Sequence, residues 1–432
     1  MAGETRARSR RRIIVLFLSV CLTVSAVSWT AGATADSPGG AESTLSAETA
    51  ARLDAAVAVA RAQADASGAL IGVWAPWAGN WVVAQGTTAR GGHTPLTTSM
   101  RFRIGTNTTA MTCTVLLRLV DEGIVQLADP VSRYLNRDAG LSGITLGQLC
   151  QGTSGIADFT RVLTPQFVNT PERQWPPVEL ATNGLAKPRT MQPGEGWAQS
   201  DTGIVLLGMV LEAATSQNLD SLYQHYIFDP LGMADTSFPD PATLEIPGAH
   251  PHGYAAALDS AGTPACSDVR DETALSSSMA WAAGGVVSTL DDLKTWAQAL
   301  ATSRLLGPDS AAAQWATLPT GAGTPSWQGY GFGGWQLGPM RGSVGSIPGF
   351  VSAALVDPAT SLTVVVMLNN STAGAGFARA LAQELAAIAS TLPSSNGGAA
   401  PAITLPWTAE QSAAELATAP CPAAPAAAAP AG

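Results

Sequence analysis

The spacing of hydrophobic and polar residues predicts a helix and then two strands near the start of the chain. From Ala47 to Ala66 the apolar residues recur at helical spacing, with arginine and aspartate between them. Residues 70–74 and 81–85 are short apolar runs that predict two strands. The pair Gly79-Asn80 lies between them and predicts the connecting turn. We therefore expect a helix followed by a β-hairpin.

The remaining pattern predicts a helical middle and a return to strands. A helix is predicted over residues 108–121, and residues from about 130 to 310 have the pattern of mostly helices and long loops. Strand patterns then return, and an amphipathic helix closes the region. These later elements are strands at 334–337, 350–356 and 362–368 and a helix at 377–388. Strands at both ends indicate one sheet built from both ends of the chain, with the helical middle inserted into it.

Both ends of the chain differ from this body in composition. An arginine-rich start, an uncharged apolar run from Ile13 to Trp29 and the small residues Ala33-Thr34-Ala35 form the pattern of a cleaved export signal. After Ser394 the chain is rich in alanine and proline. We divide the chain into a signal peptide (1–35), a flexible lead (36–46), one domain (47–393) and an Ala/Pro-rich tail (394–432). Within the domain we assign sheet parts at about 47–105 and 325–393 and a helical insertion at about 106–324.

The export signal predicts a secreted or otherwise extracytoplasmic protein. Arg10-Arg11-Arg12 is compatible with the general secretory route and with the twin-arginine route, and both stay open. A membrane anchor is the rival interpretation. The apolar run is slightly short for a spanning helix and a cleavage site follows it, so we expect no stable membrane insertion after cleavage.

An exported protein can form disulfides, and four cysteines remain after the predicted cleavage site. Four cysteines allow three pairings. We favour Cys113 with Cys150, because each lies on a predicted helix. No Cys-x-x-Cys spacing occurs, and His250-Pro251-His252 is interrupted by proline, so we expect neither a metal nor another cofactor.

Charge narrows the possible partners and the possible chemistry. The chain has 432 residues, a formal net charge of −10 and only 12% charged residues. This acidity argues against a nucleic-acid-binding protein, because such proteins concentrate positive charge. Only two of the basic residues are lysines, Lys187 and Lys294, so chemistry that needs a lysine at a set spacing has two possible positions.

Short motifs occur in a fixed order between residues 47 and 390. They are Phe102-Arg103-Ile104-Gly105, 119–123, 127–131, Ile144-Thr145-Leu146, Thr153-Ser154-Gly155, Pro193-Gly194, 228–233, Ala283-Gly284-Gly285, 330–333 and Pro348-Gly349-Phe350. In this order they resemble the penicillin-recognising serine hydrolases, namely class C β-lactamases and secreted D-Ala-D-Ala carboxypeptidases. The resemblance implies an α/β (α+β) fold. It consists of an antiparallel sheet from both chain ends flanked by helices, with an inserted all-helical domain and a site in the cleft between them.

The resemblance also implies three catalytic elements, and all three are altered here. In the family, Ser-x-x-Lys supplies a nucleophile and a base one helical turn apart, and Tyr-x-Asn supplies a phenol and an amide. A Lys/His-Thr/Ser-Gly strand lines the cleft with a polar or positive group. The first element falls on Thr106 and Thr109, the second on Gln199 and Asp201, and the third on Ser343. The nucleophile, base, phenol, amide and positive group are all replaced.

No other part of the sequence restores these elements. Neither lysine lies three residues after a serine, and no Gly-x-Ser-x-Gly motif occurs. One alternative makes Asp201 the base for Thr106, directly or through water. One plainer interpretation makes Asp201 a cap for a helix predicted at 202–214, or a carboxylate that favours the positive end of that helix. Another makes Thr106 the N-cap of the helix at 108–121.

These observations favour a pseudo-enzyme that keeps the fold as a binding or scaffolding module. The alternative is an active carboxypeptidase, esterase or β-lactamase type of enzyme that uses Thr106 with an unconventional base. The family suggests a cell-wall peptide or a β-lactam-like small molecule as ligand. The sequence specifies no oligomeric state.

Overall fold

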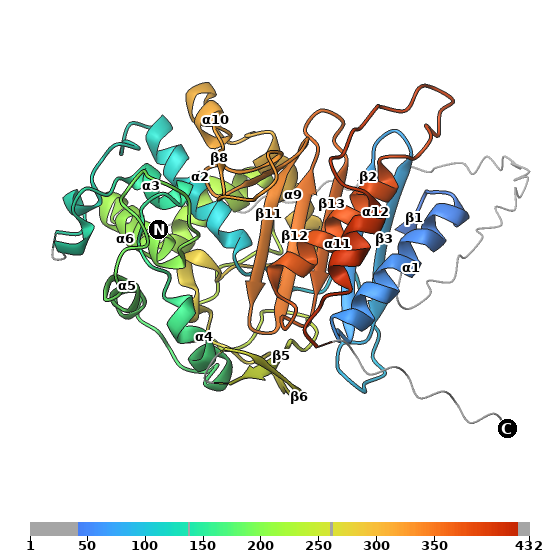
Figure 1. The fold of residues 1–432 in the computed structure, drawn as a ribbon, viewed down its shortest axis with the longest axis horizontal. Helices are drawn as coiled ribbons and strands as arrows, with labels where there is room; N and C mark the ends of the chain where they lie inside the picture. The colour runs from blue at the N-terminus through green and yellow to red at the C-terminus, as the bar shows by residue number, and fades with distance from the viewer. Residues whose placement is uncertain (1–41, 137–138, 260–261, 422–432) are drawn as a thin grey trace, which may run out of the picture. The chain divides into compact units, whose positions relative to one another are not determined.

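The computed structural model describes residues 42–136, 139–259 and 262–421, and the predicted signal peptide lies outside them. A nine-stranded antiparallel sheet is its central element (Figure 1), with the strand order β1-β3-β2-β13-β12-β11-β10-β9-β8. The strands are β1 (Glu42–Ser43), β2 (Gly68–Ala75), β3 (Gly79–Gly86), β8 (Leu318–Pro319), β9 (Gln328–Tyr330), β10 (Trp335–Leu337), β11 (Met340–Ile347), β12 (Phe350–Val356) and β13 (Thr363–Leu368). Because β2 pairs directly with β13, the prediction of one sheet built from both chain ends is confirmed.

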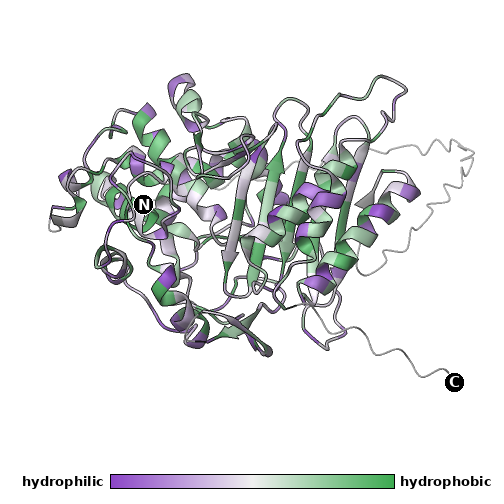
Figure 2. Cartoon of the chain, in the orientation of Figure 1, coloured by the Kyte–Doolittle hydropathy of each residue, from purple (hydrophilic) through white to green (hydrophobic). Residues whose placement is uncertain are grey.

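Helices cover both faces of this sheet. On one face α11 (Gly374–Ala389) packs on the central strands, with α1 (Ala47–Gln63) and α12 (Ala409–Leu416) beside it (Figure 1). On the other face lie α9 (Leu290–Ala301) and α2 (Asn107–Asp121). Strands β12 and β13 are buried along their whole length, and Figure 2 shows them as mostly hydrophobic. Burial on both faces explains why these strands are mostly apolar rather than alternating between apolar and polar residues.

The chain between β4 (Phe102–Arg103) and β9 forms a mainly helical region. Its helices are α2, α3 (Leu146–Gln151), α4 (Thr160–Asn169), α5 (Pro177–Leu185), α6 (Asp201–Thr215), α7 (Leu219–Tyr223), α8 (Asp229–Leu231), α9 and α10 (Pro308–Gln314). Short 3-10 turns occur at Val131–Arg133, Ala139–Leu141, Ser277–Met279 and Trp281–Ala283, and a π turn at Gln224–Phe228. The predicted helix at 108–121 corresponds to α2 and the one at 202–214 to α6, so both predictions are confirmed.

The insertion is not all-helical, and the prediction was wrong in that detail. It contains a hairpin of β5 (Tyr254–Leu258) and β6 (Pro264–Asp271), and β7 (Val287–Ser288), which pairs with β4 (Phe102–Arg103). The hairpin is fixed by distant backbone groups. Tyr254 donates its N–H to the Asn369 carbonyl (3.0 Å) and accepts from the Ser371 N–H (2.9 Å). A local pattern does not reveal partners more than one hundred residues away in sequence.

The predicted turn between the first two strands is displaced. The turn lies at Pro76–Ala78, whereas Gly79 and Asn80 are the first residues of β3. Asn80 pairs across the sheet with Trp74, and the Thr44 hydroxyl donates to its side-chain oxygen (2.7 Å). Residues 42–43, in the segment predicted as a flexible lead, also pair with β3.

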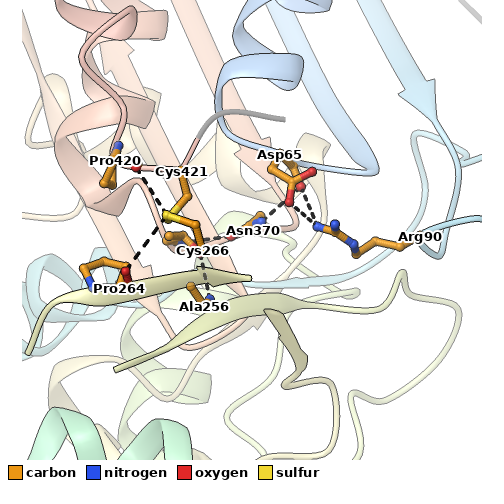
Figure 3. Close-up of a disulfide and its surroundings, with 9 residues drawn as sticks. Asp65, Arg90, Ala256, Pro264, Cys266, Asn370, Pro420 and Cys421 are labelled. Atoms are coloured by element: carbon orange, nitrogen blue, oxygen red, sulfur yellow. Dashed lines mark hydrogen bonds and ion pairs between the residues drawn. A yellow bond between two sulfur atoms is a disulfide. The ribbon is translucent and has the colours of Figure 1, made fainter. Parts of the chain in front are cut away.

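Two disulfides join segments that are distant in sequence. Cys113 on α2 bonds Cys150 on α3, which confirms the predicted pair, and Cys266 on β6 bonds Cys421. Figure 3 shows the second bridge connecting the β5–β6 hairpin to the C-terminal segment, near Asn370 and the Asp65–Arg90 ion pair. The described part of the Ala/Pro-rich segment thus packs on the domain through α12 and this bridge. Among the described helices, none is long and apolar enough to cross a membrane.

Candidate active site

Thr106 stands where the resemblance places a nucleophile, immediately before α2. It occupies the N-cap position, as the plain interpretation predicts. Its side chain forms no capping hydrogen bond, however, so capping does not explain the hydroxyl. Its hydroxyl instead donates to the Val344 carbonyl (3.1 Å) and accepts from the Ser346 N–H (3.3 Å). Both partners are backbone groups of β11. The hydroxyl therefore connects the start of α2 to the neighbouring strand.

Thr109 lies one helical turn further on, at the position of the family lysine. Its side chain is 7% exposed, and its hydroxyl donates to the Ala283 carbonyl (3.2 Å). A threonine hydroxyl does not take up a proton at neutral pH. Thr109 therefore occupies the position of the general base but cannot act as one.

Ser343 on β11 belongs to a buried, neutral hydrogen-bond network. Its hydroxyl donates to the Asn107 side-chain oxygen. The Asn107 amide donates to the Ser352 hydroxyl (2.7 Å) and to the Ile104 carbonyl (3.1 Å). This network attaches β11 and β12 to the first turn of α2, so Ser343 serves packing at a position where the family carries a positive group.

Gly345 is retained from the third element, and the packing accounts for it. A Cβ atom at this position would lie 2.0 Å from the Ile104 carbonyl oxygen and 2.9 Å from the Asn107 backbone nitrogen. Only a residue without a side chain lets β11 come this close to the start of α2. The retained glycine therefore needs no substrate to explain it.

Asp201 is the first residue of α6, where the family element has an asparagine. The cap of this helix is Ser200, whose hydroxyl accepts from the Gly203 N–H (3.2 Å), so the capping interpretation of Asp201 is wrong. Asp201 does lie in the first turn, at the positive end of the helix, as the other plain interpretation expected. The Asp201 side chain is 6% exposed, and one of its oxygens accepts a long hydrogen bond from the Gln199 amide (3.5 Å). Burial, and then the negative charge of Asp158, raise the pKa of the Asp201 carboxyl well above its usual value, while the Gln199 bond lowers it.

Asp158 is a site residue that the sequence analysis missed. Its carboxylate accepts from the Thr160 N–H (3.0 Å), and the backbone N–H of Asp201 lies close enough to lower its pKa. Burial raises its pKa, and the hydrogen bonds to Thr160 and the charge of Arg161 oppose that rise. One signal was available, because Asp158 is the only charged residue between Asp138 and Arg161.

Tyr330 is the second missed residue. It lay in a motif that we used only for the resemblance, yet its side chain lines the cleft beside Asp201. Burial, and then the negative charge of Asp201, raise the pKa of the Tyr330 phenol. The phenol therefore stays protonated and does not replace the missing proton relay as a phenolate.

Two adjoining clefts bring these residues together. The smaller, of about 60 Å³, is lined by all five substituted motif positions: Thr106, Thr109, Gln199, Asp201 and Ser343. The larger, of about 410 Å³, shares three of them and extends to Asp158 and to the β5–β6 hairpin. The charged residues among the described lining of both clefts are Asp158 and Asp201, without a lysine, arginine or histidine.

This arrangement limits the chemistry of the site. A hydroxyl is present at Thr106, but no amine or imidazole lies among the described lining residues to take its proton. Within residues 42–136, 139–259 and 262–421, no group of three His, Cys, Asp or Glu side chains is placed to hold a metal ion. The clefts offer hydroxyls, an amide, a phenol and two carboxylates.

Known proteins share this framework. The β-lactamase family matches residues 53–388. Penicillin-binding protein 4* of Bacillus subtilis is 29% identical over 150 residues, covering 33% of this chain and 31% of that protein. The D-alanyl-D-alanine-carboxypeptidase/endopeptidase AmpH of Escherichia coli is 31% identical over 142 residues, covering 32% of this chain and 36% of that protein. The chain thus aligns with about a third of the length of these relatives.

A solved structure extends the similarity over most of the fold. A D-stereospecific amidohydrolase from Streptomyces sp. superposes with a TM-score of 0.64 at 28% identity, covering 74% of this chain and 93% of that one. The family match spans the sheet, the helical insertion and α11. The chain belongs to the β-lactamase family of serine hydrolases.

Proposed function

We propose that this protein is an exported pseudo-enzyme, which uses the β-lactamase fold to bind a ligand or partner without acyl transfer. One observation carries the proposal. The Thr106 hydroxyl is held between two backbone groups of β11, and the residue one turn along α2 is Thr109 rather than an amine. A hydroxyl nucleophile needs a neighbouring group that accepts its proton, and a backbone carbonyl such as that of Val344 cannot take it.

The expected loss of turnover is large. Removing the nucleophile or the base of a cooperating hydrolase site costs about a million-fold in turnover. Here the nucleophile has gained a β-methyl group and the base is absent. The phenol of the second element is absent as well, because Gln199 replaces it. The retained Gly345 has a packing role that does not require catalysis.

The second candidate is an active hydrolase that uses Thr106 with Asp201 as base. Two observations favour it: both residues line the same clefts, and the pKa of Asp201 is raised, as a general base requires. Against it, the Thr106 hydroxyl donates to the Val344 carbonyl, and the Asp201 side chain accepts from the Gln199 amide. The pseudo-enzyme accounts for more of the contacts.

Location and ligand are part of the proposal. The arginine-rich start, apolar run and small-residue cleavage site support export. The family supports a ligand from the cell wall or a β-lactam-like small molecule, since two relatives are named as a penicillin-binding protein and a D-alanyl-D-alanine-carboxypeptidase. We propose that the mature protein works outside the cytoplasm.

Fluorescent penicillin labelling and nitrocefin turnover test the proposal on the purified mature protein. We expect no covalent label and no hydrolysis above a Thr106→Ala control. Labelling that Thr106→Ala abolishes would overturn the proposal and favour the active enzyme. The second candidate also requires that an activated ester add an acyl mass to Thr106, and an unchanged protein mass across a panel of esters would remove its support.

A further inference from the structure

We propose that the larger cleft recognises its ligand through a positively charged ammonium group attached to an apolar group. The inference rests on the proposed function, because it describes the ligand of a cleft that binds without turnover. It starts from the charge of the lining. Two carboxylates, Asp158 and Asp201, face the cleft, and no described lining residue is basic.

The Asp201 carboxyl group makes fewer hydrogen bonds than its two oxygens can accept. The side chain is 94% shielded from solvent, since only 6% of its surface is exposed. Its Oδ1 accepts the 3.5 Å bond from Gln199, and within the described part of the chain no hydrogen bond reaches Oδ2. A buried carboxylate is costly unless it is paired or hydrogen-bonded. A ligand cation in the cleft would supply the missing partner.

Asp158 adds a second negative charge at the same place. The backbone N–H of Asp201 acts on its carboxylate, and both residues line the same cleft. Two carboxylates this close disfavour each other's ionisation, and a cation between them relieves that repulsion. The positive charge that acts on Asp158 is that of Arg161, which is not among the described residues that line the cleft.

The remaining walls of the cleft favour a ligand that carries an apolar group next to its ammonium group. Its walls include Phe167, Val168, Leu258, Met279 and Ile347. The volume of about 410 Å³ falls within the usual range for small-molecule sites. A compact ammonium compound with one aromatic or aliphatic group matches both the charge and the walls.

The same charges disfavour a ligand that enters with a carboxylate. The family position that carries a positive group holds Ser343, whose hydroxyl is engaged with Asn107. A carboxylate in this cleft would meet two acidic side chains and no compensating cation among the described lining residues. A wall peptide would therefore present a free amino group here, rather than its terminal carboxylate.

Calorimetry with three probes of one shape tests this inference. Phenethylamine is a cation, 2-phenylethanol is neutral and 3-phenylpropionate is an anion, and none of them can acylate a hydroxyl. We expect phenethylamine to bind at least tenfold more tightly than either other probe, as a charge-assisted hydrogen bond to a buried carboxylate implies. We expect Asp201→Asn and Asp158→Asn each to weaken phenethylamine binding at least tenfold.

The control variant is Asp268→Asn. Asp268 lies on β6, pairs with Arg270 and is 55% exposed, so its loss removes one surface charge of the same sign without touching the cleft. We expect it to leave the affinity unchanged. The inference is overturned if phenethylamine does not bind, if 3-phenylpropionate binds as tightly, or if both cleft variants bind like the wild type. Because these probes report binding alone, penicillin labelling of the same sample reports separately on the proposed function.

Discussion

Replacing Gly345 by alanine tests whether packing explains the one retained residue of the third catalytic element. The new Cβ would lie 2.0 Å from the Ile104 carbonyl oxygen and 2.7 Å from the Asn107 side-chain nitrogen. Ordinary carbon–oxygen contacts exceed about 3.4 Å, so β11 or the turn before α2 must move by more than about 1 Å. The movement would also disturb the hydrogen bonds among Ser343, Asn107 and Ser352.

The magnitude follows from these contacts. Overpacking of a tight site costs about 1–3 kcal/mol, and a rigid backbone oxygen places Gly345→Ala at the upper end. Reduced freedom of the unfolded chain returns about 0.4–1 kcal/mol. We therefore expect the free energy of unfolding to fall by about 2 kcal/mol. Since 1 kcal/mol shifts the melting temperature of a large domain by about 2–4 °C, the melting temperature falls by roughly 4–8 °C.

Gly376→Ala is the matched control. Gly376 lies in the first turn of α11, and a Cβ there meets nothing within 4 Å. Alanine is the better helix former, so this variant gains up to about 1 kcal/mol. Urea unfolding followed by tryptophan fluorescence measures both variants against the wild type. A Gly345→Ala midpoint equal to that of the wild type or above it would refute the packing explanation.

Three further predictions concern Asp201, the C-terminal disulfide and the altered motifs. The pKa of Asp201 is raised in the folded state above its unfolded value of about 3.9. Its contribution to the free energy of unfolding is therefore favourable below the unfolded pKa and is lost as pH rises through the folded-state pKa. Asp201→Asn should therefore be more stable than the wild type at pH 7, with the difference shrinking towards pH 4 in urea titrations, and equal stability at pH 7 would contradict this. Removing the Cys266–Cys421 bridge by the double serine variant should cost about 2–5 kcal/mol, because the bridge spans 155 residues, and an unchanged melting temperature would show that it does not restrain the unfolded chain. Restoring the family residues together should produce β-lactam acylation detectable by mass, and continued silence would show that the cleft has also changed shape. The five replacements are Thr106→Ser, Thr109→Lys, Gln199→Tyr, Asp201→Asn and Ser343→His.

Strong apolar runs made most of the sheet predictable. The strand predicted at 350–356 is observed at those residues, because β12 is buried on both faces and Ser352 is its one polar residue. The neighbouring β11 gave no such pattern, since it contains two glycines and two serines whose roles depend on contacts with α2. The β5–β6 hairpin was missed for a similar reason, because Tyr254 takes its backbone partners from residues 369–371.

The candidate site was only half predictable. The five substituted positions came from motif order, and the smaller cleft brings all of them together. Asp158 belongs to no such motif, and its contact with Asp201 depends on how the chain folds back between α3 and α6. The hydroxyl partners of Thr106 and Thr109 were equally hidden, because they are backbone carbonyls and N–H groups on distant segments. Sequence indicated which groups are absent, and the structure shows which contacts the replacements make.

The most direct test of the central claim is the intact mass of the mature protein after incubation with penicillins and activated esters. Because the Thr106 hydroxyl is engaged with β11 and Thr109 is not a base, we predict an unchanged mass with every reagent. An acyl adduct that maps to Thr106 and disappears in Thr106→Ala would contradict the claim and establish an active hydrolase.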